Sequence, residues 1–341
     1  MTLFFQDIYL PYYILLCSLK FLYNQQFILE QILSENILLL DLGGTNLRIG
    51  LGNKELKSID KISKQKIDSN EHLHEIIGNI VRDSKSSEIV MSVAGPKTNN
   101  SITMTNRNLV FDSDELKKDT NTKMFSLLND WESIGYCLPL LDDSDIKVIK
   151  GGKIDNEQTC LAIGPGTGLG FSVLRYINGH PYVSATELGN TRFYNNFLVN
   201  HFELDDIDEF QVLESFISGK GLEKIYFSKT KEKLTSEEIV KSFDSDKNSN
   251  FVLIKFNEAI GKILSDLALT FLAYGGIYIA GSLMRSINEL DINDFMNNSF
   301  VSHPSNEHKN ILENTSINLI TKEHTPLYGN LNYSIVRRFH E

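Results

Sequence analysis

The sequence predicts an α/β protein in which two similar domains face each other across a cleft. The main observation is a pattern that occurs twice: an apolar strand, a glycine-rich turn and a second apolar strand. It occurs in ILLLDLGGTNLRIGLGN (37–53) and again in TCLAIGPGTGLGFSVLRY (159–176). Further strands alternate with amphipathic helices along the chain, as in α/β folds. The length of 341 residues is sufficient for two domains of common size.

The individual elements follow from hydrophobic periodicity and turn residues. Strands are expected at 37–41, 47–52, 87–96, 124–130 and 277–281. Helices are expected at 72–85, at 131–141, where Pro139 stops the helix, and at 251–274. Thr235 and Glu238 have the spacing of a capping box, which predicts a helix start after residue 235. The polar tracts 227–238 and 244–250 are expected to be surface loops.

We expect a smaller α/β domain formed by residues 36–138 and 328–341, and a larger one formed by residues 139–327. Residues 1–35 are an apolar extension of unknown role, in which residues 21–33 have the pattern of an amphipathic helix. The uncharged run between Asp7 and Lys20 is shorter than the ~20 residues that span a bilayer. A basic region and a cleavage site typical of signal peptides are lacking. A packed or poorly ordered extension is favoured over membrane contact by residues 1–33 or a mis-assigned start codon.

Composition limits the classes of partner and the compartment. Asp and Glu number 44 against 33 Lys and Arg, which gives a net charge of −11, and no long basic run occurs. Nucleic acid is therefore not expected as a partner, because its phosphates would be repelled. Cys17, Cys137 and Cys160 are scattered and odd in number, which fits neither a disulfide framework nor a paired zinc site. A reducing cytoplasm is the expected location.

The first glycine turn carries more polar groups than a hairpin needs. A hairpin requires only a pair such as Asn-Gly, whereas here Gly43, Gly44, Thr45 and Asn46 follow Asp41. Backbone N–H groups in such a turn can surround a phosphate, with the Thr45 hydroxyl as an additional donor. Asp41 cannot bind phosphate directly, but its carboxylate can hold Mg²⁺ through water. The alternative is a purely structural turn.

The second glycine turn, GPGTGLG (164–170), matches neither common nucleotide motif. It lacks the Gly-Lys-Ser/Thr ending of a P-loop, and its glycines do not have the G-x-G-x-x-G spacing of a dinucleotide fold. A strand follows it, whereas both motifs require a helix. Together with the first turn, Gly166, Thr167 and Gly168 suit an ATP clamped between two domains, and Gly281 is expected to be a third contact.

Asp130 is the catalytic candidate. It lies where the apolar strand MFSLLND meets the helix WESIGYCLPLL. Ligands of α/β proteins collect at the carboxyl ends of strands, where a carboxylate can take a proton from a substrate hydroxyl. Phosphoryl transfer needs positioning, charge neutralisation and one such base. The alternative is that Asp130 is only the N-cap of the helix, a position that Asp favours.

Six segments occur in an order and spacing that resemble the bacterial glucokinase family: LDLGGTNLR, MTNRNLVF, LLNDWESIGYCLPLL, GPGTGLG, LESFISGKGLEKIY and YGGIYIAGSLMRSI. The resemblance covers the chain from about Asn36 and implies the two-domain, actin-like ATPase (ribonuclease H-like) fold of hexokinase, actin and Hsp70. It implies an ATP-dependent glucokinase with Mg²⁺ as cofactor, and Asp130 as the base at the sugar 6-hydroxyl. The implied sugar contacts are Asn106, Asn129, Asp130, Glu187, Asn190 and Glu214.

The sugar loop departs from the family pattern. The family usually reads Glu-Gly-Gly-His, whereas this chain has Glu187-Leu188-Gly189-Asn190. Asn190 is shorter than histidine and cannot become cationic, and Leu188 restricts the backbone. Two alternatives to a glucokinase therefore stay open: a kinase of mannose, fructose or an amino sugar, and a sugar-binding sensor with weak catalysis. A homodimer is also left open.

Overall fold

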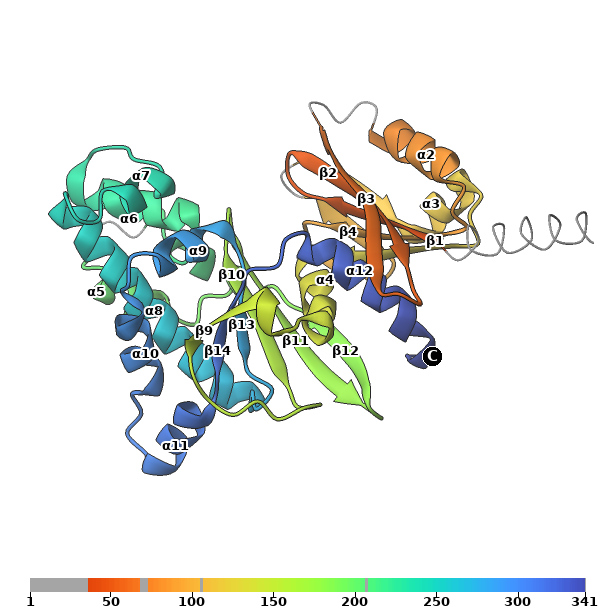
Figure 1. Cartoon of the computed structure of the whole chain (residues 1–341). Helices are drawn as coiled ribbons and strands as arrows, with labels where there is room; N and C mark the ends of the chain where they lie inside the picture. The colour runs from red at the N-terminus through yellow and green to blue at the C-terminus, as the bar shows by residue number, and fades with distance from the viewer. Residues whose placement is uncertain (1–35, 68–72, 105–106, 206–207, 341) are drawn as a thin grey trace, which may run out of the picture.

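The computed structural model describes residues 36–67, 73–104, 107–205 and 208–340 (Figure 1). A five-stranded sheet forms the first half, in the order β3-β2-β1-β4-β8. Its strands are β1 (Asn36–Leu42), β2 (Asn46–Asn53), β3 (Ser58–Lys66), β4 (Glu88–Val93) and β8 (Met124–Asn129). Strands β1 to β3 pair antiparallel, whereas β1, β4 and β8 run parallel. The carboxyl ends of β1, β4 and β8 therefore meet at one edge of the sheet.

A six-stranded sheet repeats this arrangement in the second half, in the order β12-β11-β10-β13-β14-β9. Its strands are β9 (Ile146–Lys150), β10 (Cys160–Pro165), β11 (Leu169–Ile177), β12 (His180–Ala185), β13 (Ile277–Ile279) and β14 (Ile317–Ile320). Strands β10 to β12 are antiparallel neighbours, β10, β13 and β14 run parallel, and β9 is an antiparallel edge strand. The predicted repeat of strand, glycine turn and strand is thus confirmed, since β1–β2 and β10–β11 are equivalent hairpins.

Helices separate and flank the two sheets (Figure 1). Helices α2 (Leu73–Ser84) and α3 (Ser113–Thr120) cover the outer face of the first sheet, and α4 (Asp130–Cys137) and α12 (Thr325–Val336) lie between the sheets. The outer face of the second sheet is covered around α8 (Lys247–Phe271), with α5 (Asn195–His201), α6 (Gly219–Thr230), α7 (Ser236–Lys241), α9 (Ser282–Asn288), α10 (Asn293–Val301) and α11 (Asn306–Asn314). This is the predicted actin-like α/β architecture.

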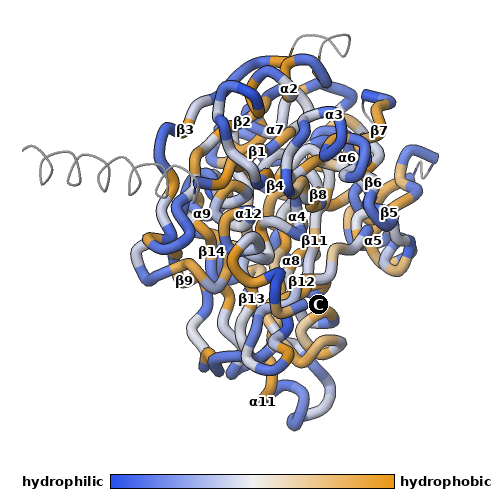
Figure 2. The backbone as a smooth tube through the Cα atoms, turned by 90° about the vertical axis from the view of Figure 1, so that its right-hand side faces the viewer, coloured by the Kyte–Doolittle hydropathy of each residue, from blue (hydrophilic) through white to orange (hydrophobic). Residues whose placement is uncertain are grey.

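The layering explains the composition of the central strands. In β1, Leu38 and Leu40 pack toward α2 and α3, whereas Ile37 and Leu39 pack toward α4 and α12. A strand buried on both faces has to be apolar at consecutive positions, which is why this segment lacks alternation. Figure 2 shows hydrophobic residues concentrated in the interior segments and hydrophilic ones in the outer turns.

A small third sheet follows β4. It consists of β5 (Lys97–Thr98), β6 (Ser101–Met104) and β7 (Leu109–Asp112), which pair antiparallel. Gly95 leads into it with φ +152°, and a Cβ atom at this position would overlap the Thr103 carbonyl. The chain therefore needs glycine here to place the third sheet beside the end of β4.

Several expected boundaries shift. The long helix begins at Lys247, capped by Asp246, so part of the tract 244–250 is helical. Helix α4 ends at Cys137, and Pro139 lies in the 3₁₀ turn Leu138–Leu140 that follows. The predicted capping box at Thr235 is confirmed. The Thr235 hydroxyl accepts a hydrogen bond from the Glu238 N–H at 3.3 Å, and the Glu238 carboxylate accepts one from the Thr235 N–H at 2.8 Å.

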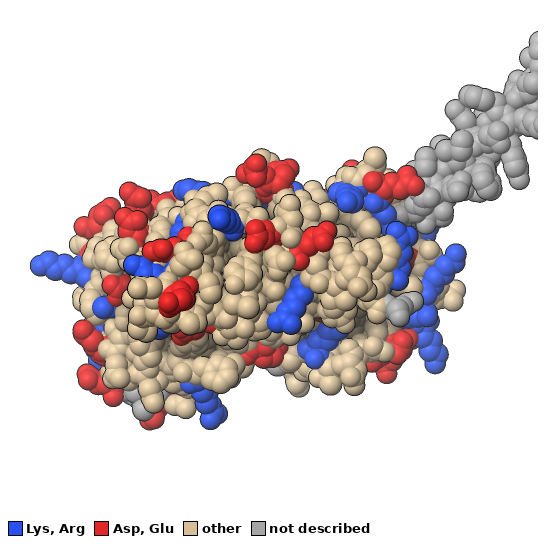
Figure 3. All heavy atoms as spheres, turned by 90° about the horizontal axis from the view of Figure 1, so that it is seen from below, with Lys and Arg blue, Asp and Glu red and all other residues tan. Residues whose placement is uncertain are grey.

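Two expectations about the organisation of the chain stay open. The amphipathic pattern at 21–33 lies outside the described residues. The division at residues 138 and 328 stays a prediction. In the described ranges, no helix has the combined length and apolarity needed to cross a membrane. On the face seen in Figure 3, acidic and basic side chains are interspersed and the basic ones do not form a continuous stripe.

Candidate active site

Asp41 lies at the carboxyl end of β1 and is 3% exposed. The register of the sheet places Arg48 of β2 on one side of it and Ser92 of β4 on the other. Its Oδ2 atom lies 2.6 Å from the Arg48 guanidinium, and its Oδ1 atom accepts a hydrogen bond from Ser92 Oγ at 3.0 Å. Burial raises the pKa of Asp41, although Arg48 opposes this effect. The strand end therefore holds a carboxylate in a fixed orientation.

The first glycine turn begins two residues after Asp41. Gly43 N–H donates to the Asn46 carbonyl at 2.9 Å, and the Asn46 amide donates to Thr45 Oγ1 at 2.7 Å. From outside, Arg107 Nε donates to the Gly44 carbonyl at 2.9 Å. The turn is thus fixed on its carbonyl side by a residue of the loop that connects β6 and β7.

The turn glycines are distinguished by open space around their Cα atoms, not by an unusual backbone conformation. Among the described residues, positive φ occurs at Gly281 (+116°) but at neither glycine of the 43–44 pair nor of the 166–168 turn. Their contribution is free space. A Cβ atom at Gly43 would meet only the Asn46 carbonyl, at 3.7 Å, and one at Gly166 would meet nothing within 4 Å. A ligand can therefore approach the backbone of both turns closely.

Asp41 fits a water-mediated Mg²⁺ ion. Mg²⁺ retains several waters and is commonly held by one or two carboxylates together with substrate phosphates. Each Asp41 oxygen makes one protein contact, and a carboxylate oxygen can accept more than one bond. In the described part of the chain, no group of three or more His, Cys, Asp or Glu could hold a metal ion. An ion bound here would therefore depend on water and phosphate oxygens.

The second glycine turn is attached to the start of α6. Gly166 N–H donates to the Gly168 carbonyl at 2.8 Å, and the Gly219 N–H donates to the Gly166 carbonyl at 2.8 Å. Gly281 lies beside Pro165, which begins the same turn, so the predicted third contact is close to the second turn. Sequence reasoning overlooked the start of α6, although Ser218 followed by Gly219 is a recognisable N-cap signal.

The two remaining glycines of GPGTGLG have a different role. Gly164 and Gly170 pair directly across β10 and β11. The indole of Trp131 lies where a Cβ atom of Gly170 would be, and a Cβ atom at Gly164 would overlap both the Ala280 carbonyl and the edge of the same indole. These glycines therefore leave room for the side chain of Trp131, the second residue of α4. The packing of this indole attaches the start of α4 to the second sheet.

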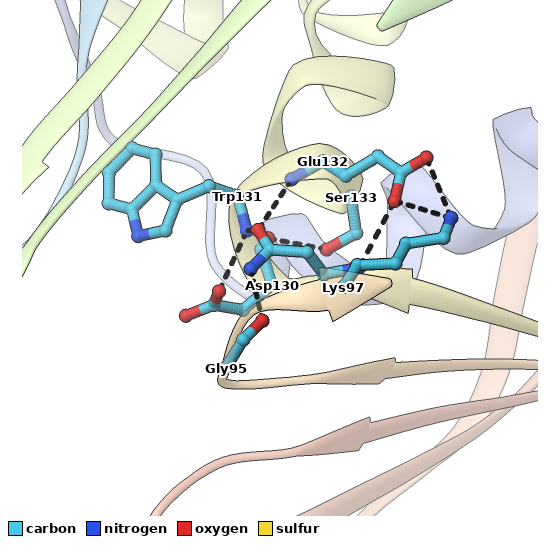
Figure 4. A network of polar contacts seen from close by, with 7 residues as sticks. Gly95, Lys97, Asp130, Trp131, Glu132 and Ser133 are labelled. Carbon is cyan, nitrogen blue, oxygen red and sulfur yellow. Dashed lines mark hydrogen bonds and ion pairs between the residues drawn. The ribbon is translucent and has the colours of Figure 1, made fainter. Parts of the chain in front are cut away.

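Asp130 is the first residue of α4, directly after the end of β8. The helix cap is Asn129, whose side chain accepts from the Trp131 and Glu132 N–H groups, so the alternative that Asp130 is only the cap is wrong. Asp130 Oδ1 accepts from the Trp131 N–H at 3.0 Å. Figure 4 shows its carboxylate directed away from the ion pair of Lys97 and Glu132.

The protonation of Asp130 suits a general base. Burial, followed by the negative charges of Asp41 and Glu187, raises the pKa of Asp130 to about 7, while the Trp131 N–H acts in the opposite direction. A base with a pKa near the operating pH can both accept a proton and release it.

Two of the six predicted sugar contacts, Glu187 and Asn190, lie on the loop after β12. Glu187 and Asn190 are exposed, and the Asn190 amide donates to Glu187 Oε2 at 3.1 Å. Glu214 Oε2 accepts from the Leu169 N–H at 3.2 Å and would obstruct a Cβ atom at Gly168. Glu214 thus connects this loop region with the second glycine turn. Asn106 lies outside the described residues, and Thr167 is exposed in the turn.

Comparisons with known proteins agree with this arrangement. The sequence profile of the glucokinase family matches residues 38–334. A glucokinase of Colwellia psychrerythraea is 30% identical over 287 residues, which cover 76% of this chain and 84% of that protein. A glucokinase of a Nostoc species is 29% identical over 229 residues, 58% of this chain and 67% of that protein.

Solved structures show the same fold. A glucokinase from an Antarctic psychrotroph has a TM-score of 0.73 at 22% identity, over 89% of this chain and 99% of that one. A glucokinase from Balamuthia mandrillaris, solved in complex with glucose, has a TM-score of 0.71 at 19% identity, over 89% and 94%. The family profile extends from β1 into α12, and the solved glucokinases have the same overall fold. This chain therefore belongs to the glucokinase family of sugar kinases.

Proposed function

We propose that this sugar kinase transfers the γ-phosphate of ATP to the 6-hydroxyl of glucose, with Asp130 as general base. The observation that carries the proposal is the placement of Asp130. It begins α4 at the sheet edge where β1 also ends, one residue after Asp41, and its pKa of about 7 allows proton uptake near neutral pH. A base with these properties is what phosphoryl transfer to a hydroxyl requires.

In the proposed step, the hydroxyl oxygen forms a bond to the γ-phosphorus while the bond from that phosphorus to the bridging oxygen of ADP breaks. Asp130 takes the hydroxyl proton, and ADP leaves. The backbone of Gly43, Gly44, Thr45 and Asn46 would bind phosphate from one side, and the turn at 166–168, with Gly281, from the other. Bound Mg²⁺ would neutralise phosphate charge, held by Asp41 through water.

The sugar would be bound by groups that match its ring of hydroxyls. Carboxylates such as Glu187 and Glu214 accept hydrogen bonds, and the amides of Asn106, Asn129 and Asn190 both donate and accept. Buried polar groups that lose a partner disfavour a wrong substrate, so such a site can select one hexose.

The free thiols of Cys137 and Cys160 are compatible with a cytoplasmic location.

A coupled assay of ADP release with Mg·ATP tests the proposal across glucose, mannose, fructose and glucosamine. We expect the highest kcat/KM for glucose. A higher kcat/KM for another hexose would favour the second candidate, a kinase of that sugar, which the Leu188 and Asn190 substitutions in the sugar loop motivate. Sugar binding by calorimetry without ADP formation on any hexose would contradict the kinase and favour a sensor.

A further inference from the structure

The start of α4 is held by an ion pair that connects it to the third sheet (Figure 4). Lys97 Nζ lies 2.9 Å from Glu132 Oε2 and 3.1 Å from Glu132 Oε1. Lys97 is the first residue of β5, and Glu132 is the third residue of α4, where it is 8% exposed. A carboxylate this well buried depends on its cation, since an unpaired buried charge is strongly unfavourable.

The same carboxylate holds the residue before Asp130. Glu132 Oε2 accepts from the Asn129 N–H at 3.1 Å, while the Asn129 side chain caps the helix and donates to the Gly95 carbonyl at 2.7 Å. Asn129 is therefore fixed at both its backbone and its side chain. Asp130 lies between Asn129 and Trp131, so its Cα position follows from the contacts of these two neighbours.

The two neighbours are held by different sheets. Trp131 lies on the glycine pair of the second sheet, whereas Asn129 and Glu132 are bound to the segment from Gly95 to Lys97. Loss of the Trp131 contact would free one side of Asp130, and loss of Lys97 would weaken the other. On that other side the hydrogen bond from Asn129 to the Gly95 carbonyl would remain, but the buried Glu132 carboxylate would lose its cation.

We propose that Lys97 is a positioning residue, which acts through Glu132 and Asn129 to hold Asp130 in place for proton transfer. The inference rests on the proposed function of Asp130 as the base. Small displacements of a catalytic group can lower the rate by up to ~10²-fold without loss of the fold. Because the ion pair lies on the Asp130 side of the site, its loss should affect kcat far more than the KM for ATP.

The chain offers a closely matched control. Lys322 Nζ lies 2.9 and 3.1 Å from the two carboxylate oxygens of Asp145, and the pair is similarly buried. Asp145 is also the third residue of a capping box, that of Asp142. Lys322→Met therefore removes the same kind of interaction at a place that holds neither Asn129 nor Trp131.

The experiment compares Lys97→Met, Lys97→Arg, Glu132→Gln and Lys322→Met in the full chain. We expect kcat to fall about tenfold in Lys97→Met, as for a displaced base, with the KM for ATP unchanged. Lys97→Arg should restore most of kcat, and Lys322→Met should retain it. Glu132→Gln keeps an acceptor for Asn129 N–H and should lose less than Lys97→Met. An unchanged kcat in Lys97→Met, or an equal loss in Lys322→Met, would overturn the inference.

A second measurement needs no activity. Trp131 is the single tryptophan of the sequence, so fluorescence emission reports on the start of α4. Amide hydrogen exchange at Trp131 and Glu132 reports on the same turn. Both should change in Lys97→Met and not in Lys322→Met; unchanged exchange in both would refute the positioning role. A wild-type protein inactive on every hexose would instead refute the proposed function and leave this measurement to decide the role of Lys97.

Discussion

The indole of Trp131 lies directly against the backbone of Gly170, in the space that a side chain at position 170 would occupy. Gly170 pairs with Gly164 across β10 and β11, and Trp131 contacts both. Trp131, the residue after the proposed base, can therefore pack on the second sheet only because positions 164 and 170 have no side chain.

Gly170→Ala should therefore destabilise the protein and move Trp131. Forcing a methyl group into a packed site costs about 1–3 kcal/mol. Thermal unfolding should show this loss, and Trp131 emission should shift. Gly151→Ala is the control, because a Cβ atom at Gly151 meets nothing within 4 Å. Equal stability of the two variants would contradict the close fit.

The sequence alone was sufficient for the features that depend on local pattern. Apolar runs and glycine turns identified the β1–β2 and β10–β11 hairpins, and the predicted end of β8 placed Asp130 at the strand–helix junction where the structure has it. The strand β3 could not be found in this way, because its residues Ser58–Lys66 are largely exposed and lack clear alternation. The short strands of the third sheet leave as little signal.

Contacts between distant segments could not be predicted either. Asn129 and Asp130 are both good caps, and only the extended backbone of Asn129 decides which residue caps α4. Lys97 and Glu132 are separated by 35 residues, and their pairing depends on how the third sheet folds back. The role of Gly164 and Gly170 depends on Trp131, a residue of another element. In each case the tertiary arrangement selects among residues with similar local preferences.

Asp130→Asn should lower kcat by ~10²–10⁴, the usual contribution of a general base. The amide has the size of the carboxylate but cannot accept the hydroxyl proton. Steady-state assays at saturating ATP and hexose would measure this, with circular dichroism to verify folding. A folded Asp130→Asn protein that keeps near wild-type turnover would disprove the assignment of the base.

Asp41→Asn should raise the Mg²⁺ concentration needed for half-maximal activity by about 10–100-fold, the usual effect of losing a residue that supports a metal site. The amide keeps hydrogen-bonding capacity but loses the charge that attracts the hydrated ion. Titration of activity with Mg²⁺ at fixed ATP is the measurement. Asp112→Asn is the control, since Asp112 caps α3 outside the proposed site and Asn is also a favoured cap. Matching Mg²⁺ curves for Asp41→Asn and wild type would argue against Asp41 as the metal-binding carboxylate.

Deletion of residues 1–33 should leave kcat and both KM values unchanged. Every residue in the proposed site lies at or after Asp41, and β1 begins at Asn36. Kinetic comparison of the full chain with the truncated chain tests this. Loss of activity in truncated protein that stays soluble and folded would show that the N-terminal segment contributes to the enzyme.

The pKa of Asp130 predicts a conflict between stability and activity. The folded-state pKa, about 7, lies above the ordinary value of 3.8, so the native state binds the proton more tightly than the unfolded chain. The stability contributed by the protonated form is complete below pH ~4 and is lost as the pH rises through 7. At pH 8 the half-buried Asp130 carboxylate is charged, and this charge makes the wild-type protein less stable than it would be with a neutral side chain at position 130.

Asp130→Asn should therefore be more stable than wild type at pH 8, by on the order of 1–2 kcal/mol after screening at a half-buried site, with little difference at pH 4. Urea unfolding at both pH values measures the change. Asp112→Asn should show the opposite trend, because hydrogen bonds from Ser101 and from the start of α3 lower the pKa of Asp112. A stability difference for Asp130→Asn that is the same at both pH values would mean that Asp130 titrates near its ordinary pKa, and the electrostatic argument for its role as base would fail.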